Sequence, residues 1–200
     1  MIKAVVFDVG GVLLRTEDRG YRRHWEEKLG IGDWAADDIV FNSASGTQAQ
    51  TGLITEEAHW QWVGHHLGLT APELSQFRHD FWAGDQIDQE LMAYIGQLRS
   101  RYQTAIISNA MDGLRHALTH TYGIAPLFDL IVVSAEEKVM KPKLAIYERT
   151  LARLGCAPHE AVFIDDFAHN VAAAREAGMA AVHFTPGLDL PQALAALGVQ

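Results

Sequence analysis

The hydrophobic positions of this chain gather in short continuous runs rather than in an alternation of apolar and polar residues. Continuous runs of this length are typical of strands that are buried on both faces of a parallel sheet. We therefore predict a central sheet with helices on both of its faces. Its strands are expected at residues 4–7, 104–108, 130–134, 161–165 and 180–184.

The segments between the later runs carry apolar residues at helical spacing, at 112–123, 143–155 and 170–178. The second and third of these end in Gly155 and Gly178, residues that favour the left-handed backbone conformation at a helix end. Strands and helices in alternation predict an α/β fold, a doubly wound parallel sheet with right-handed crossovers. These crossovers bring the C-terminal ends of the strands to one edge, where such sheets bind ligands.

The segment 15–90 interrupts the alternation, because it is far longer than one crossover helix requires. It is helical in pattern, and Thr70 and Glu73 have the spacing of a capping box. We predict that 15–90 forms an inserted helical cap beside the C-terminal edge of the sheet. Residues 1–14 and 91–200 would form the α/β core. The Gly- and Thr-containing stretch 43–55 is expected to be the cap loop that reaches this edge.

Composition and charge narrow the class of partner. The chain has 200 residues and a formal net charge of −9, with no Lys- and Arg-rich run. These features argue against binding to nucleic acid or to an anionic membrane. The single cysteine, Cys156, excludes an internal disulfide, and we expect it to be a small buried hydrophobic residue. The N-terminal apolar run is too short to span a membrane, so we expect a cytoplasmic protein.

Polar side chains occur at the ends of the predicted strands or in the loops that follow them. Because these ends share one edge of the sheet, we expect the side chains to lie close together. Crowded carboxylates repel one another unless a cation lies among them, and a set of oxygen ligands suits Mg²⁺. A lysine and a serine supply the charge and the hydroxyl donor that bind a phosphoryl group. The residues are Asp8, Ser108, Asn109, Lys141, Asp165 and Asp166.

Two glycines follow Asp8 closely. Without a Cβ, the backbone at Gly10 and Gly11 is able to approach a ligand closely and to present its N–H and C=O groups to it. We therefore include both residues in the predicted phosphate-binding site.

Four motifs occur in order along the chain: FDVGGVLL, IISNA, MKPKLAIY and FIDDFAHNVAAAREAGM. In this order and spacing they resemble the haloacid dehalogenase (HAD) superfamily, whose members mostly transfer phosphoryl groups through an aspartate. The helical insertion resembles the subfamily with an α-helical cap after the first strand. The resemblance therefore implies a HAD-like Rossmannoid core with an inserted cap.

The resemblance also implies catalytic roles. Asp8 would be the nucleophile that forms an aspartyl-phosphate, and Lys141 would neutralise Asp8 and the phosphate. Ser108 and the Asn109 amide would hold the transferring phosphoryl oxygens.

The resemblance further implies a Mg²⁺ site. Asp8 and Asp166 would bind the ion, with Asp165 beside them acting directly or through water. The backbone carbonyl of Gly10 would complete the protein's share of the ligands. Asn170 is expected to tether the acidic loop.

Gly10 departs from the pattern of the superfamily. Phosphatases of this kind usually have a second aspartate there, which protonates the leaving alcohol and then activates water. Losing a general acid and base typically costs about 10²–10⁴-fold in rate. Three explanations stay open: another group replaces it, the substrates have better leaving groups, or turnover is slow. The replacement would be ordered water or one of His24, Glu17 and Asp112.

These observations predict a Mg²⁺-dependent phosphatase that acts on a small phosphorylated metabolite, such as a sugar phosphate, as a monomer or a homodimer. One alternative is a 2-haloacid dehalogenase, which needs no metal and typically has a bulky aromatic residue where Gly10 stands. The acidic pair Asp165-Asp166 favours the metal-dependent branch. The other alternative is a non-catalytic relative that binds a phosphate ligand or a protein partner.

Overall fold

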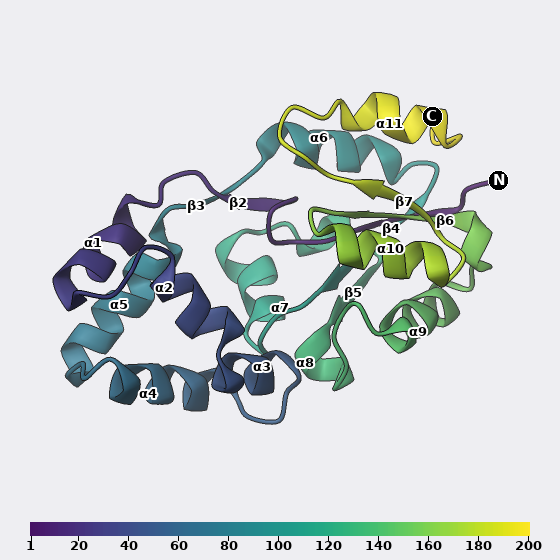
Figure 1. Ribbon diagram of the computed structural model, residues 1–200. Helices are drawn as coiled ribbons and strands as arrows, with labels where there is room; N and C mark the ends of the chain where they lie inside the picture. The colour runs from purple at the N-terminus through teal and green to yellow at the C-terminus, as the bar shows by residue number, and fades with distance from the viewer.

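The five predicted strands form one parallel sheet in the order β5-β4-β1-β6-β7. The computed structural model describes residues 1–200, and Figure 1 shows the sheet within one of two lobes. The predicted positions of all five strands are confirmed to within a residue or two. Their bounds are β1 (Ala4–Phe7), β4 (Gln103–Ser108), β5 (Leu130–Val133), β6 (Ala161–Asp165) and β7 (Ala180–His183).

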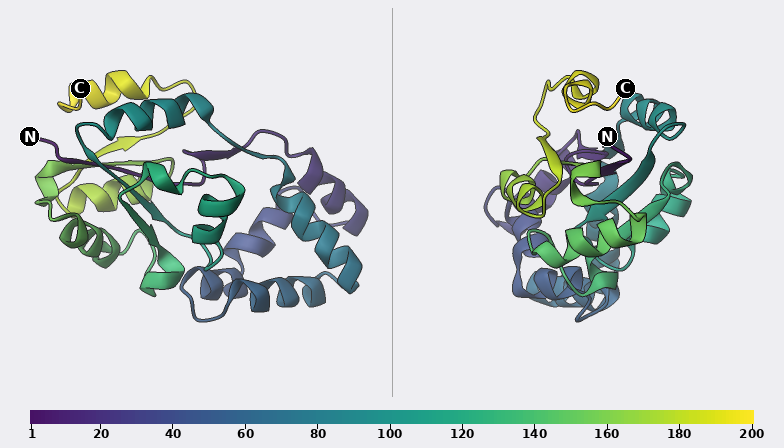
Figure 2. Two further views of the ribbon diagram at one scale, coloured as in Figure 1. Left: turned by 180° about the vertical axis from the view of Figure 1, so that it is seen from behind. Right: turned by 90° about the vertical axis from the view of Figure 1, so that its right-hand side faces the viewer.

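Both faces of the sheet are buried, which explains why the strands do not alternate between apolar and polar residues. In β1, Val5 and Phe7 belong to one apolar cluster and Ala4 and Val6 to the other. Helices cover the two faces, as Figures 1 and 2 show. They are α6 (Gln89–Leu98) and α11 (Leu190–Ala196) on the first face, and α9 (Leu144–Leu154) and α10 (Ala168–Glu176) on the second.

The predicted helix ends are largely observed. Gly155 follows α9 with a left-handed backbone (φ 65°), and Gly178 has φ 86° just beyond α10. The segment after β4 differs from a regular α-helix, because α7 (Leu114–His116) continues as the π-helix η2 (Ala117–Thr121). Short helices complete the core: η3 (Ala125–Leu127), α8 (Ser134–Glu137) and η4 (Pro158–Glu160).

The second lobe consists of helices from the long insertion, and it packs around its own apolar cluster. Trp25, Trp60, Phe77 and Phe81 are buried in this cluster. The Thr70–Glu73 capping box is formed. The elements are α1 (Gly20–Leu29), α2 (Ala35–Asp37), η1 (Asp38–Asn42), α3 (Ala44–Gln50), α4 (Glu56–His66) and α5 (Ala71–Ala83).

Two details of the prediction are wrong. The stretch 43–55 is not a loop throughout, because α3 occupies Ala44–Gln50 and the Ser43 hydroxyl caps it by accepting a bond from the Gly46 N–H. Cys156 is half-buried rather than buried, because it follows the end of α9 in a surface connection. No helix has both the length and the apolar character that crossing a bilayer requires.

The lobes are joined by a two-stranded antiparallel ribbon that the sequence pattern did not predict. It consists of β2 (Leu14–Thr16) and β3 (Asp85–Ile87). The buried Arg22 guanidinium ties the ribbon to the helices, because it donates to Asp85 at 2.8 Å and to the Phe81 carbonyl at 2.8 Å. We propose that residues 15–90 are the cap and that 1–14 and 91–200 are the core. The ribbon then lies close to the two places where the chain passes from one lobe to the other.

Phe77 tests the independent core of the cap. Its ring is fully buried and meets the edges of Trp25 and Trp60 at centroid distances of 5.4 and 6.2 Å. We expect Phe77→Ala to lower the free energy of unfolding of the cap by about 3–5 kcal/mol, because it leaves a cavity. Urea denaturation followed by tryptophan fluorescence measures this. Leu53→Ala is the control, since Leu53 is 73% exposed. Equal losses in the two variants would contradict the assignment.

Candidate active site

Asp8 directly follows the central strand β1 and lies at the edge of the sheet that faces the cap. The Asp8 N–H donates to the Ile164 carbonyl of β6 at 2.8 Å, which fixes where the chain leaves the strand. The neighbouring strands β4 and β6 end in Ser108 and Asp165. The parallel register therefore brings residues from three distant parts of the sequence to one place.

The Lys141 ammonium lies between two carboxylates. Its Nζ is 2.8 Å from Asp8 Oδ1 and 2.6 Å from Asp165 Oδ2, and the side chain is 1% exposed. The Asn109 side chain fixes the Lys141 backbone from both sides: it donates to the Lys141 carbonyl at 3.0 Å and accepts from the Lys141 N–H at 2.8 Å. Two carboxylates at strand ends therefore hold the positive charge of Lys141, and the Asn109 side chain holds its backbone.

The two oxygens of Asp8 are not equivalent. Oδ1 accepts from the Val9 N–H at 2.7 Å as well as from Lys141. Oδ2 has no hydrogen-bond partner within the protein, and neither does the Ser108 hydroxyl. Asp8 thus has one oxygen that is held and one that is available to a ligand.

Asp165 is fully buried and its oxygens are occupied. Oδ1 accepts from the Phe167 N–H at 2.8 Å and from Asn170 Nδ2 at 3.0 Å. Oδ2 accepts from Asn170 Nδ2 at 3.1 Å and from Lys141. Asn170 does tether the acidic loop, as the sequence suggested. Asp165 therefore has no oxygen without a partner, and one of its contacts holds Lys141 in place.

Asp166 differs from Asp165 in its hydrogen bonding. Its Oδ1 is buried without a hydrogen-bond partner, which is costly unless a ligand satisfies it. Its carboxylate lies directly against the backbone of Gly11, which has a φ of +73°, and a Cβ at Gly11 would overlap it. A Cβ at Gly10, by contrast, would meet no heavy atom within 4 Å. Gly11 thus makes room for Asp166, whereas Gly10 borders open space.

The site carries more negative charge than it neutralises. Asp8, Asp165 and Asp166 each place one oxygen within 4.8 Å of the others, against the single ammonium of Lys141. Burial raises the pKa of Asp8 to about 7, because Lys141 offsets only part of the desolvation and the neighbouring Asp165 raises it further. Burial, and then Asp165, also raises the pKa of Asp166. A divalent cation that prefers oxygen ligands, such as Mg²⁺, fits this donor set.

The cap contacts the loops that follow β4 and β5. The Ser134 hydroxyl donates to the Gln50 carbonyl at 2.6 Å, and Lys138 Nζ donates to the Gly52 carbonyl at 2.5 Å. Asp112 Oδ1 accepts from the Glu56 N–H at the start of α4 at 3.0 Å. The turn after α3 therefore lies against the same edge of the core that carries the site.

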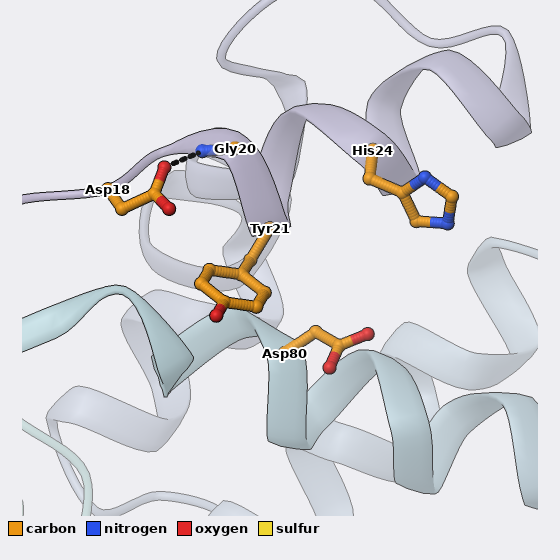
Figure 3. A pocket seen from close by; sticks show the side chains of 5 residues that line it. All are labelled: Asp18, Gly20, Tyr21, His24 and Asp80. Carbon is orange, nitrogen blue, oxygen red and sulfur yellow. Dashed lines mark hydrogen bonds between the residues drawn. The ribbon is translucent and has the colours of Figure 1, made fainter.

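The three candidates for the missing acid and base do not belong to the cluster of Asp8, Asp165 and Asp166. Asp112 caps α4, and Glu17 is paired with Arg15 at 3.2 Å. Figure 3 shows His24 in a cavity of about 170 Å³ in the cap, near Asp18, Tyr21 and Asp80. None of the residues that line this cavity belongs to the strand ends.

Sequence reasoning missed two supports of the site. The side-chain clamp of Asn109 on Lys141 is one. The other is His183 on β7, whose Nε2 lies 2.9 Å from the Asp166 carbonyl. The register of the sheet, which pairs His183 with Asp165, is the signal that could have found it. The clamp depends on a loop conformation for which the sequence has no pattern.

Comparison with known proteins identifies the family. The model of the haloacid dehalogenase-like hydrolases matches residues 2–178, so this chain belongs to that family of hydrolases. A sesquiterpene phosphatase, astK, from Aspergillus oryzae is 26% identical over 93% of this chain and 91% of its own length.

Solved structures share the fold. A HAD-like family hydrolase from Porphyromonas gingivalis superposes with a TM-score of 0.81 at 25% identity, covering 100% of this chain and 99% of the other. A HAD family enzyme from Bacteroides thetaiotaomicron, in complex with magnesium and inorganic phosphate, has a TM-score of 0.81 at 23% identity, covering 96% and 99%.

The two glycines form a matched pair for testing the metal site. We expect Gly11→Ala to weaken Mg²⁺ binding by about 10–100-fold, because the new Cβ displaces the Asp166 carboxylate. Gly10→Ala should leave the affinity within about twofold, since its Cβ enters open space. Isothermal titration calorimetry of both variants measures this, with circular dichroism as the check on folding. Equal affinities in the two variants would refute the placement of Asp166.

The raised pKa of Asp8 predicts a pH dependence of metal binding. Below a pKa of about 7 the Asp8 carboxyl holds a proton, and Mg²⁺ must displace it. The affinity should therefore fall by up to about tenfold for each pH unit below 7, with proton release. Calorimetry in buffers of different ionisation enthalpy counts the proton. Asp8→Asn should lower the number of protons released, and an affinity independent of pH between about 6 and 8 would contradict the expectation.

Proposed function

We propose that this hydrolase is a Mg²⁺-dependent phosphatase of small phosphorylated metabolites that works through an aspartyl-phosphate on Asp8. The observation that carries the proposal is the difference between the two oxygens of the Asp8 carboxylate. Lys141 and the Val9 N–H hold Oδ1, while Oδ2 is free at the ligand-binding edge of the sheet. The similarity to a phosphatase along nearly the whole chain supports the same reaction class.

The first step is attack of Asp8 Oδ2 on phosphorus. A bond forms between Oδ2 and phosphorus, the bond from phosphorus to the leaving oxygen breaks, and the leaving group takes the electron pair. Lys141 keeps Oδ1 in place and offsets negative charge near the phosphoryl group. The Ser108 hydroxyl is free to donate to a phosphoryl oxygen, and we assign the Asn109 N–H to the same task. The Gly11 N–H, which the sequence placed with these donors, is occupied instead, because it donates to the Leu14 carbonyl at 2.9 Å.

The second step returns Asp8 to its starting state. Water attacks phosphorus, the bond from phosphorus to Oδ2 breaks, and the carboxylate regains its electron pair. Asp165 and Asn109 prevent Lys141 from moving with the departing phosphate, because they hold its ammonium and its backbone.

The metal ligands that we propose are Asp8, Asp166 and the carbonyl of Gly10. The buried Asp166 Oδ1 without a partner supports this set, whereas Asp165, with both oxygens occupied, would act through water. A bound Mg²⁺ would neutralise charge on the phosphoryl oxygens. The Bacteroides protein with this fold holds both magnesium and inorganic phosphate, which supports the pairing of these two ligands.

The test is release of inorganic phosphate from a panel of sugar, nucleoside and acyl phosphates. We expect release that needs Mg²⁺, stops with EDTA, and falls to the level of buffer in Asp8→Asn. This isosteric change removes the nucleophile and keeps the shape of the side chain. Glu17→Gln is the matched control, since this carboxylate is exposed and lies outside the machinery. Its rate should be unchanged.

Two outcomes would replace the proposal. Release of halide from a 2-haloacid without Mg²⁺ would make the chain a dehalogenase. Absence of any product from folded protein, combined with tight binding of inorganic phosphate, would make it a non-catalytic binding relative.

A further inference from the structure

We propose that the substrates of this site are phosphoryl donors whose leaving group departs without a proton, with acyl phosphates as the class. This inference rests on the proposed phosphatase function and specifies its substrate. It follows from the proton-bearing groups around Asp8, all of which are engaged, and from the open space beside Gly10.

None of the titratable side chains gathered around Asp8 is free to protonate a leaving group. The Lys141 ammonium is buried between Asp8 and Asp165, where loss of its proton would leave two carboxylates unpaired. Asp165 is fully buried and accepts hydrogen bonds on both oxygens. Asp8 is the nucleophile and Asp166 is committed to the metal. The Ser108 hydroxyl is too weak an acid for this role.

No other element supplies the missing acid at Gly10. The φ of Gly10 lies outside the left-handed region, so its backbone would accept a side chain without strain. Its Cβ would meet no heavy atom within 4 Å, so no carboxylate or imidazole from the cap or a neighbouring loop fills this position. Asp112 is engaged at the contact between cap and core, Glu17 is paired with Arg15, and His24 lies in the cavity of the cap. Apart from the two neighbours of Gly10 in the chain, the protein places no proton donor within 4 Å of that Cβ.

The chemistry of the first step then selects the donor. When the bond from phosphorus to oxygen breaks in an alkyl phosphate, an alkoxide takes the electron pair and needs a proton in the transition state. Without a general acid this step loses about 10²–10⁴-fold. In an acyl phosphate the electron pair goes to a carboxylate, which is stable without a proton. The same active site therefore retains its rate on acyl phosphates and loses it on alkyl phosphates.

The second step has its own consequence. Water attacks the phosphorus of the aspartyl-phosphate, Asp8 leaves as a carboxylate, and the proton of the water passes to a phosphate oxygen because no side-chain base receives it. Loss of that base slows this step by a factor of the same order. With an acyl phosphate as donor, formation of the aspartyl-phosphate is faster than its hydrolysis, and the intermediate accumulates.

A leaving-group series tests the proposal. We would measure kcat/KM with Mg²⁺ for acetyl phosphate, nitrophenyl phosphate, phenyl phosphate and glycerol phosphate. The expected result is a steep fall as the leaving group becomes more basic, at least about 100-fold from acetyl to glycerol phosphate after correction for uncatalysed hydrolysis. A burst of acetate release, equal to the enzyme concentration, should precede the steady state.

Two variants at Gly10 isolate the cause. Gly10→Asp introduces a carboxyl into the open space, and it should raise kcat/KM for glycerol phosphate by about tenfold or more and flatten the series. Gly10→Asn has the same size and no acidic proton, so it should not. Circular dichroism confirms that both variants fold.

The outcomes separate this proposal from the proposed function. Similar kcat/KM for all four donors in the wild-type protein, or equal behaviour of Gly10→Asp and Gly10→Asn, would overturn the substrate class and leave the phosphatase intact. Release of phosphate from none of the donors would overturn the proposed function itself.

Discussion

A single buried ammonium group, that of Lys141, is the interaction on which the sheet edge depends. It is the only ammonium group among three carboxylates. Burying an ion pair such as Lys141 and Asp165 away from water is costly unless its geometry and hydrogen bonds compensate for the lost hydration. The structure compensates with fixed partners: Asn109 holds the Lys141 backbone, and Asn170 donates to both oxygens of Asp165. The negative charge that remains is what draws a proton or a divalent cation into the site.

The two adjacent glycines satisfy different physical requirements. Gly11 is needed because the Asp166 carboxylate lies against its backbone, and its positive φ would strain any other residue. Gly10 has neither constraint, so the absence of a side chain there is not a demand of the fold. A position that tolerates a side chain and lacks one is better explained by the chemistry of the site than by its packing. Packing against Asp166 therefore explains the glycine at position 11, whereas packing does not explain the glycine at position 10.

Much of the architecture was accessible from the sequence, because burial on both faces of a sheet forces continuous apolar runs in β1, β4, β5, β6 and β7. The grouping of Asp8, Ser108, Lys141 and Asp165 followed from topology, since parallel crossovers place all strand ends on one edge. Features that depend on side-chain geometry could not be predicted from the sequence. The clamp of Asn109, the difference between Asp165 and Asp166, and the ribbon β2–β3 arise from contacts between distant segments. The helix α3 was missed because Gly and Thr content is a weak guide to a capped short helix.

In the function that we propose, the two lobes divide the recognition of a substrate between them. The core would hold the phosphoryl end through Asp8, Lys141 and Ser108, whose positions are fixed by strands and hydrogen bonds. The leaving group would extend past Gly10, where the core offers no side chain, toward the edge that the cap contacts. Backbone groups of the cap make three hydrogen bonds at that edge, through the Gln50 and Gly52 carbonyls and the Glu56 N–H. Side-chain packing adds to them: Met111 of the core is buried in the apolar cluster of the cap, and a Cβ at Gly52 would overlap the Ala135 carbonyl. In the proposed reaction, the chemical class of the acid released would follow from the proton that the core does not supply, and the cap would select among acids of that class.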